Sequence, residues 1–437
     1  MGGLRSRALA WIFVFTGLVG GGVCSAQAQE EAVIKRATQL RSEPGAAGTV
    51  VVDVAAGARI TRTSQRQGAW VQVRSESGAA GWIHMFDIGA PLRENAAADA
   101  LRALGNKVGG GSSLTLPTAT VGIRGLGEGN VSNSVGVGER GGSQSQGLGA
   151  AESLRVNADQ ARLFAASATL VPLRVDALPV PALAAPAAAA PGATPVGQAP
   201  SAAGGGAALG SLLQAVGGVT EAQELELGRQ VAGLLLQGKP LDPTAEMQRY
   251  VNVLGRWISL QSSRPHLPWT FVVVDESDFN AYSAPGGYVF VTRGLVDRCT
   301  DEAELAGILA HEIAHVALQH PLYAMHNAAR SGKVNTSLNA LARHVHLMGH
   351  GADAEHAADR EAVALAARAG LDPFGLVLAL VQLNALGDSD LQYADAHPQS
   401  RLRLDHLEQA MAQRLDGLAG PKTAITIEQR LAAVERK

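Results

Sequence analysis

The sequence predicts a mixed α+β protein in which a small all-β unit precedes a helix-rich unit with a small sheet. Three observations predict this order. Short alternating apolar runs crowd into residues 31–90, Gly-, Ala- and Pro-rich chain fills residues 93–218, and capped helical patterns begin near residue 219. A length of 437 residues allows two or three such domains.

The N-terminus, residues 1–28, has the order of a secretory signal peptide. Arg5 and Arg7 precede an apolar run, and a stretch of small residues that ends at Ala28 follows it. The apolar run is shorter than the ~20 residues that cross a bilayer, which makes an uncleaved anchor the weaker alternative. We therefore expect cleavage after Ala28, a mature chain without a transmembrane segment, and a periplasmic location.

Charge and histidine placement narrow the class of function. A net charge of -3 argues against a nucleic-acid partner, because such proteins usually present a basic face. Eleven of the 12 histidines lie after residue 260. We therefore expect the chemistry to reside in the helix-rich unit.

Residues 29–92 form the predicted all-β unit. The segments "LRSEPG", "VVVDVAAGARI" and "GAWVQVRSESGAAGWI" follow one another with turn residues between them. Their order resembles the bacterial SH3-like domain, with Trp70 and Trp82 where that family has strand tryptophans. The resemblance implies a small barrel that binds a peptide or cell-wall ligand. The alternative is that both tryptophans are core side chains only.

Residues 93–218 are predicted to be a long disordered linker, because Pro-rich chain stays extended and Gly-rich chain stays flexible. One exception is "AESLRVNADQARLFAASATL", which has the pattern of an isolated or transiently docked helix. From there, residues 219–437 show helical patterns, with Thr220 as the expected N-cap of the first. Strands are expected at "WTFVVVDES" and "GYVFVTRG", and a long amphipathic helix at "DEAELAGILAHEIAHVALQH".

The string "HEIAH" in that last helix points to a metal. His311 and His315 are four residues apart, so both imidazoles face one side of a helix and can take two corners of a zinc tetrahedron. Glu312 lies beside them as a general base for a metal-bound water.

A catalytic zinc usually has a third protein ligand on another element. The string "EHAADREAVALAARAG" supplies Glu355, while Asp359, four residues on, is placed to accept a hydrogen bond from a ligand imidazole. The alternative for this pair is a solvated acidic face beside Arg360.

At these residues the chain resembles the CAAX prenyl endopeptidase and HtpX-type zinc metallopeptidase family. The resemblance covers about residues 221–410. The family members most similar in layout are the periplasmic, BepA-like proteases without transmembrane helices. Five segments carry it: "NAYSAPGGYVFVTRGLV", "DEAELAGILAHEIAHV", "QH", "EHAADREAVALAARAG" and "HPQSRLRL". Helical repeats follow the protease domain in many periplasmic relatives, whereas this sequence ends soon after it.

The resemblance implies a zincin-type metalloprotease domain that holds one zinc ion. The implied ligands are His311, His315 and Glu355. Glu312 is then catalytic and Asp359 holds an imidazole. His397 would approach the metal, either stabilising the oxyanion or acting as a temporary fourth ligand.

The predicted function is an exported zinc metalloendopeptidase that acts on polypeptides, above all unfolded or misassembled envelope proteins. We expect the strand "GYVFVTRG" to offer its edge to an extended substrate. Two alternatives are a binding or chaperone-like scaffold with a latent protease domain, and a cell-wall peptide hydrolase. Between residues 320 and 350, a mobile lid or solvated loop is favoured over a second metal site formed by His326, His344, His346 and His350.

Overall fold

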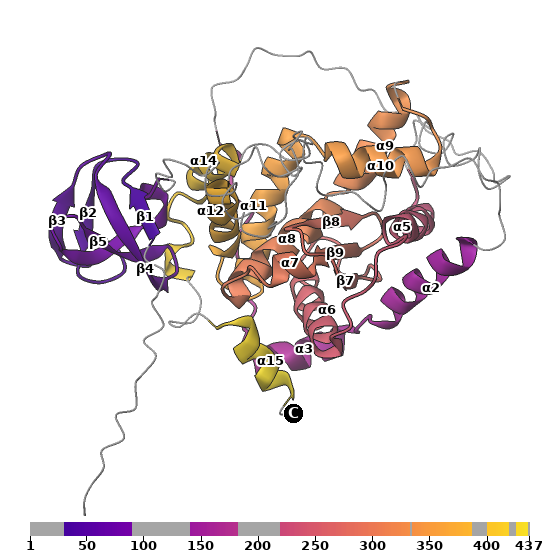
Figure 1. Cartoon of the computed structure of the whole chain (residues 1–437), viewed down its shortest axis with the longest axis horizontal. Coiled ribbons are helices and arrows are strands. Elements are labelled where there is room, and N and C mark those ends of the chain that lie inside the picture. The colour runs from indigo at the N-terminus through magenta and orange to yellow at the C-terminus, as the bar shows by residue number, and fades with distance from the viewer. Residues whose placement is uncertain are drawn as a thin grey trace, which may run out of the picture.

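An all-β unit and a helix-rich unit make up most of the described chain (Figure 1). The predicted α+β fold class is therefore confirmed. The predicted signal peptide, residues 1–28, lies outside the described residues. The computed structural model describes residues 30–89, 140–181, 219–332, 334–386, 400–418 and 425–435.

The strands and helices alternate in blocks along the chain. The strands are β1 Glu30–Val33, β2 Thr38–Arg41, β3 Val50–Val54, β4 Arg59–Gln67, β5 Trp70–Ser75, β6 Ala80–His84, β7 Thr270–Val274, β8 Ala281–Ala284 and β9 Tyr288–Thr292. The helices before residue 300 are α2 Arg140–Ser153, α3 Ala158–Ser167, α5 Glu221–Leu235, α6 Ala245–Ser259 and α7 Arg293–Val296. The later helices are α8 Glu302–Ala317, α9 His320–Arg330, α10 Leu338–Met348, α11 Ala352–Arg368, α12 Gly375–Leu386, α14 Ser400–Met411 and α15 Ile427–Glu435. Short 3-10 turns η1 and η3 span Met85–Asp87 and Asp416–Leu418.

The all-β unit, residues 30–89, is a six-stranded antiparallel sheet in the order β1-β4-β5-β6-β2-β3. Alternation along β5 places Val71 and Val73 in the core, because successive side chains of a strand point to opposite faces. Trp70 and Trp82 are half-buried, and Trp70 packs edge-on against His84 with ring centroids 5.5 Å apart. Neither tryptophan is a fully buried core side chain.

The helical unit, residues 219–435, is built around a three-stranded mixed sheet in the order β7-β9-β8. Strand β9 pairs parallel to β7 and antiparallel to β8. Every residue of β7 and β9 is buried, as expected for strands covered on both faces.

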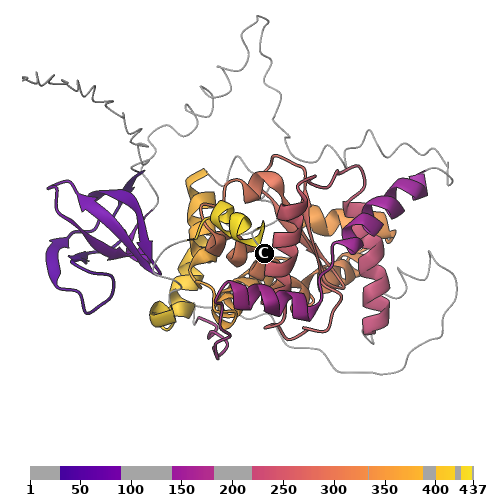
Figure 2. The same ribbon diagram turned by 90° about the horizontal axis from the view of Figure 1, so that it is seen from below.

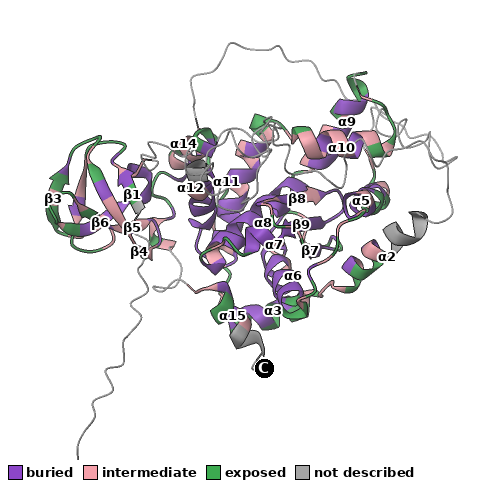
Figure 3. Cartoon of the chain, in the orientation of Figure 1, coloured by how far each residue is buried: buried purple, intermediate pink, exposed green. Residues whose placement is uncertain are grey.

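Helix α8 runs through the centre of the helical unit (Figure 3). All its residues except Ala303 are buried, so it is a core helix and not the amphipathic one we predicted. It packs against α6, α11 and α12. At Gly307 a Cβ atom would lie 2.3 Å from the backbone nitrogen of Leu376, so α8 and α12 meet at backbone contact distance.

Helix starts follow the capping chemistry of the sequence. Thr220 caps α5 as predicted, and its side chain accepts a hydrogen bond from the amide of Gln223. Asp301 caps α8 in the same way by accepting from the amide of Glu304. These caps set where the two helices begin.

Part of the predicted linker, residues 140–181, is folded. Helices α2 and α3 run along one side of the helical unit (Figure 2). Asn157 and Gln160 form a capping box that starts α3. Ala161, Phe164 and Ala165 then recur at helical spacing and are buried against α6. The helix expected in this part of the segment is thus present as α3, and it packs against α6.

Polar anchors hold the same segment to the helical unit. The Arg155 guanidinium donates to the Thr270 hydroxyl at 2.6 Å and to the Tyr288 hydroxyl at 3.0 Å. Farther along, Arg368 of α11 donates to the carbonyl oxygen of Val175 at 2.8 Å. The segment is thus tied to both the sheet and α11.

None of the helices in the described part of the chain combines the length and apolar character needed to cross a membrane.

The docking of α3 is tested by Phe164→Ala. Phe164 is 7% exposed and lies 6.2 Å from the ring of Tyr250, so its loss should lower the free energy of unfolding by about 3 kcal/mol. Leu163→Ala is the matched control, because Leu163 on the same helix is 71% exposed. Chemical denaturation followed by circular dichroism measures both, and equal stabilities would show that α3 is not docked.

Candidate metal centre

The two histidines of "HEIAH" meet on one face of α8. Four residues make just over one helical turn, so His311 and His315 stack along the helix. Their Nε2 atoms are 3.0 Å apart and their ring planes cross at 85°. The residues are 2% and 1% exposed. The tertiary fold therefore presents both Nε2 atoms to a common buried point.

Glu355 completes a cluster with these two imidazoles from α11. Its Oε2 atom lies 3.4 Å from His311 Nε2, and its Oε1 atom lies 3.3 Å from His315 Nε2. Ligands bound about 2.0–2.1 Å from a tetrahedral zinc are separated by roughly 3.3 Å. The three side chains, all buried, therefore have the separations that a zinc site requires.

Asp359 lies one turn after Glu355 on α11 and contacts the other nitrogen of His311. Its Oδ1 atom is 3.0 Å from His311 Nδ1, where it can accept that N–H and leave Nε2 free. Arg403 of α14 donates to both oxygens of Asp359, at 2.6 and 2.9 Å. Burial alone would raise the pKa of the Asp359 carboxyl, but the Arg403 guanidinium holds that pKa well below its usual range.

The charges around the cluster favour a cation. Burial and Arg403 disfavour a charged His311, yet the Asp359 and Glu355 carboxylates outweigh them and raise the pKa of His311 to about 9. Burial lowers the pKa of His315 well below its usual range, which keeps that imidazole neutral and able to bind a metal. Two imidazoles and one carboxylate form a donor set that zinc accepts. The residues therefore fit a divalent metal.

His320, to which the sequence analysis assigned no role, contacts the second imidazole. Its Nδ1 atom lies 3.0 Å from His315 Nδ1, so one ring donates to the other. Burial lowers the pKa of His320 to about 4, so its ring is neutral. If His315 binds a metal through Nε2, its Nδ1 carries the proton and donates to His320. Gln319 has a φ of 60° and turns the chain back after α8. The "QH" dipeptide was one of the segments that carry the family resemblance, but the sequence did not show that the chain reverses there and brings His320 to His315.

Glu312, the predicted general base, lies between the two imidazoles in sequence on α8 and is 3% exposed. His397, the other predicted catalytic residue, lies outside the described residues. Their catalytic roles remain predictions.

The histidine-rich segment after residue 319 is folded into α9 and α10, which pack against each other and against α8 and α5. The segment is therefore not a solvated loop, and the mobile lid stays a prediction. The His350 ring lies 4.4 Å from the His315 ring, whereas His346 packs edge-on against Tyr282 of β8 at 4.8 Å. Across the described residues, His311, His315 and Glu355 are the group of three that could hold a metal.

The strand "GYVFVTRG" is β9, and our expectation that it offers an edge to substrate is wrong. Strand β9 hydrogen-bonds to β7 on one side and β8 on the other, so it has no free edge. The short strand "AYSA", which the sequence analysis did not identify, forms β8 at the edge and packs against α8. The sequence "AYSA" has no β-branched residue, so it lacks the usual strand signal.

Two family matches cover the two folded units. Residues 244–411 match Peptidase family M48, and residues 35–87 match the bacterial SH3 domain. The first match contains the whole buried cluster, from His311 to Arg403.

Individual relatives share shorter stretches. A putative beta-barrel assembly-enhancing protease of Vibrio cholerae is 32% identical over 108 residues, which cover 25% of this chain and 22% of that protein. The metalloprotease YcaL of Escherichia coli is 32% identical over 161 residues, 33% of this chain and 63% of that protein. The mitochondrial metalloendopeptidase OMA1 of Bos taurus is 48% identical over 52 residues, 12% of this chain and 10% of that protein. The chain thus spans about a fifth of the length of the beta-barrel assembly-enhancing protease that it matches.

Metal retention separates the roles of Glu355 and Asp359. Glu355→Ala leaves two imidazoles, too few for a three-ligand site, and should abolish tight zinc binding. Asp359→Asn keeps a side chain of the same size beside Arg403 but removes the negative charge that accepts the N–H of His311. Zinc affinity should therefore fall about 10–100-fold. Zinc content after dialysis against a mild chelator measures both.

Asp353→Asn is the control for this series, since Asp353 is exposed in the first turn of the same helix. It should retain zinc like the wild type. A larger loss in Asp359→Asn than in Glu355→Ala would exchange the two roles, and full retention in both would place the third ligand elsewhere.

His320→Phe tests the hydrogen bond to His315. Phenylalanine keeps a ring of similar size but cannot accept the N–H, so zinc affinity should fall about 10-fold while the fold is retained. Competition with a fluorescent zinc chelator gives the affinity. His326→Phe, on the same helix and half-buried, should leave it unchanged. An unaltered affinity in His320→Phe would exclude the proposed contact.

Proposed function

We propose that the chain is a zinc-dependent metalloendopeptidase, because residues 244–411 match Peptidase family M48 and residues 35–87 match the bacterial SH3 domain. The observation that carries the proposal is the buried cluster of His311, His315 and Glu355, whose donor atoms lie 3.0 to 3.4 Å apart. Three protein ligands leave a fourth position for water or substrate, as catalytic zinc sites require.

The side chains around the cluster divide the work of hydrolysis. Zinc bound there would supply a Lewis acid that activates water and polarises the scissile carbonyl. Glu312 takes the proton of the attacking water and passes it to the leaving amine. Asp359 and His320 hold the ligand imidazoles by their Nδ1 atoms. His397 is proposed to stabilise the oxyanion or to act as a temporary fourth ligand.

We propose that substrates bind as extended polypeptide. Strand β8 lies at the edge of the sheet beside α8, so its outer backbone groups can pair with an added strand. Main-chain pairing selects little sequence and favours chains that lack their own structure. Unfolded or misassembled proteins are therefore the proposed substrates.

The proposed setting is the cell envelope. The signal peptide predicted at residues 1–28 would export the chain to the periplasm. The relative named beta-barrel assembly-enhancing protease suggests quality control of envelope proteins as the role. A peptide or a cell-wall fragment is the proposed ligand of the SH3 domain.

A second candidate function is a binding scaffold with a latent peptidase domain. The burial of the cluster favours it, since His311, His315 and Glu355 are at most 2% exposed and a substrate must first gain access. A cell-wall peptide hydrolase is a third, and it rests on the SH3 domain alone.

Glu312→Gln separates these functions. The amide cannot accept the proton of water, so casein cleavage should fall by about 10²–10⁴-fold while zinc content stays at the wild-type level. Comparable cleavage by the variant and the wild type would remove Glu312 from the mechanism. Release of muropeptides without cleavage of casein would favour the cell-wall hydrolase, and zinc binding without either reaction would favour the scaffold.

A further inference from the structure

The all-β unit lies beside the helical unit on the side of α14 (Figure 1). Charged side chains join the two units. In the contacts between the described residues of the two units, the basic side chain belongs to the all-β unit and the carboxylate to the helical unit. The basic groups are Lys35, Arg36, Arg66 and His84. The carboxylates are Asp301, Asp372, Asp405, Glu408 and Asp416. The two faces are thus complementary in charge.

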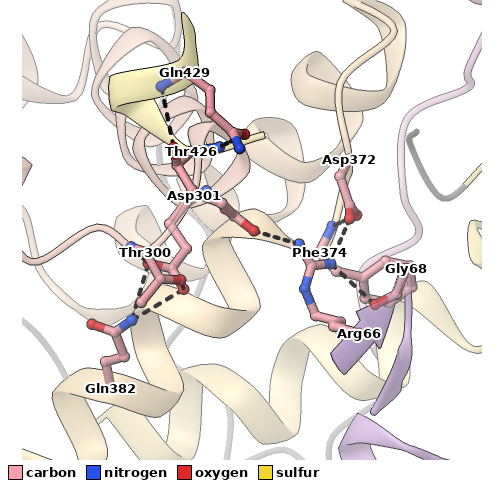
Figure 4. Close-up of polar contacts among 10 residues, drawn as sticks. Arg66, Gly68, Thr300, Asp301, Asp372, Phe374, Gln382, Thr426 and Gln429 are labelled. Atoms are coloured by element: carbon pink, nitrogen blue, oxygen red, sulfur yellow. Dashed lines mark hydrogen bonds and ion pairs between the residues drawn. The ribbon is translucent and has the colours of Figure 1, made fainter. Parts of the chain in front are cut away.

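Arg66, near the end of β4, forms the most buried of these contacts (Figure 4). One terminal nitrogen donates to Asp301 at 2.8 Å and the other donates to Asp372 at 2.5 Å. The exposed fractions of the three side chains are 12%, 6% and 10%. Burial disfavours the charged guanidinium, yet Asp372 and Asp301 outweigh burial and raise the pKa of Arg66.

Each of the two carboxylates that bind Arg66 also accepts a backbone hydrogen bond where a helix begins or is about to begin. Asp301 also accepts from the amide of Glu304 at the start of α8, and Asp372 accepts from the amide of Phe374 just before α12. Each carboxylate thus gives one oxygen to the backbone and the other to Arg66. Without the guanidinium, two mostly buried negative charges would face each other uncompensated.

Lys35 and Arg36 contact one face of α14. The opposite face of α14 carries Arg403 at the candidate metal centre. Arg403 lies against Asp359, while Asp405 and Glu408 bind Lys35 at 2.6 and 2.9 Å. At 100° per residue, Asp405 and Glu408 lie about 200° and 140° around the helix from Arg403. Helix α14 is therefore held between the all-β unit and the cluster.

We propose that the all-β unit is a docked clamp on the helical unit, and that Arg66 is a positioning residue that holds α8 and the metal centre in their working geometry. Asp301 is ten residues before His311, or about 15 Å along a continuous helix. A rigid, fully packed helix passes a shift of its first turn on to the imidazoles. The proposal rests on the proposed peptidase function only where it concerns catalysis.

The relative strength of the contacts assigns the main effect to Arg66. Lys35 and Asp405 are 39% and 36% exposed, and such surface pairs contribute about 0–1 kcal/mol. Arg66 is buried and neutralises two carboxylates at once. The same three residues line a cavity of about 410 Å³. High salt should weaken the exposed Lys35 pairs and leave the buried Arg66 contact largely intact.

The test uses the full mature chain loaded with zinc. Arg66→Gln removes the cation, and Arg66→Lys keeps a charge but not the planar fork that reaches both carboxylates. Arg74→Gln is the control, because Arg74 is an exposed arginine on β5 of the same unit. Small-angle X-ray scattering measures docking, chelator competition measures the rate of zinc loss, and cleavage of a quenched peptide gives kcat and KM.

Arg66→Gln should increase the radius of gyration, speed zinc loss about 10-fold and lower kcat about 10-fold with little change in KM. Arg66→Lys should fall between it and the wild type, and Arg74→Gln should match the wild type. An undocked Arg66→Gln with unchanged zinc loss and kcat would overturn the positioning role. A docked Arg66→Gln would overturn the clamp. If the wild type cleaves no peptide, the peptidase function fails, while scattering and zinc loss still decide the clamp.

A charge exchange keeps the clamp testable if Arg66→Gln does not fold. Lys35→Glu with Arg36→Glu places like charges against Asp405 and Glu408, and should undock the unit and speed zinc loss. Adding Asp405→Lys and Glu408→Lys restores opposite charges and should restore both readouts. Failure of the fourfold exchange to restore docking in a folded protein would overturn the assigned interface.

Discussion

The need to pair charge inside the core constrains the architecture more than any other single interaction. His311, Glu355, Asp359 and Arg403 are all at most 2% exposed, at the meeting point of α8, α11 and α14. An isolated ion in such surroundings costs several kcal/mol, so each must find a partner of opposite charge or a hydrogen bond. The bidentate contact of Arg403 with Asp359 meets this requirement, and it locates α14 relative to α11. Asp359 in turn contacts the candidate ligand His311, so this contact brings α14 next to the candidate metal centre.

The same requirement operates at the other end of α8. Its first turn carries acidic side chains that are all buried, and each is matched by a group from a distant part of the chain. Glu302 binds Arg430 of α15 through two hydrogen bonds of 2.6 and 2.7 Å, and Glu304 accepts from Gln382 of α12 at 3.0 Å. The start of α8 therefore contacts elements from both ends of the chain, β4 through Arg66 and α15 through Arg430. The acidic side chains are tolerated at the start of α8 because the helix dipole places partial positive charge at a helix N-terminus.

Local patterns predicted much of the site and of the fold. The four-residue spacing of His311 and His315 requires only a helix to bring both rings to one face, and the start of α5 at Thr220 follows from capping chemistry. Both depend only on residues within about four positions of each other, so they can be predicted from the sequence alone. The existence of the all-β unit and of the helix-rich unit follows in the same way from the periodicity of apolar residues. Sequence reasoning expected a helix at α3, isolated or transiently docked, but gave no helix for most of α2, whose composition is rich in Gly and Ser.

By itself, the sequence determined the α+β class, the helix that carries "HEIAH" and the likeness of its two units to known families. Only the tertiary structure decided which distant groups meet that helix. It placed Glu355 at 3.3 and 3.4 Å from the two imidazoles and turned His320 back onto His315. It put β9 in the middle of the sheet and β8 at an edge. It also placed Arg66 between Asp301 and Asp372, more than 230 residues away in sequence. Spacing along a chain specifies contacts within one element, whereas contacts between elements depend on how their buried faces pack and on which charges must be paired there.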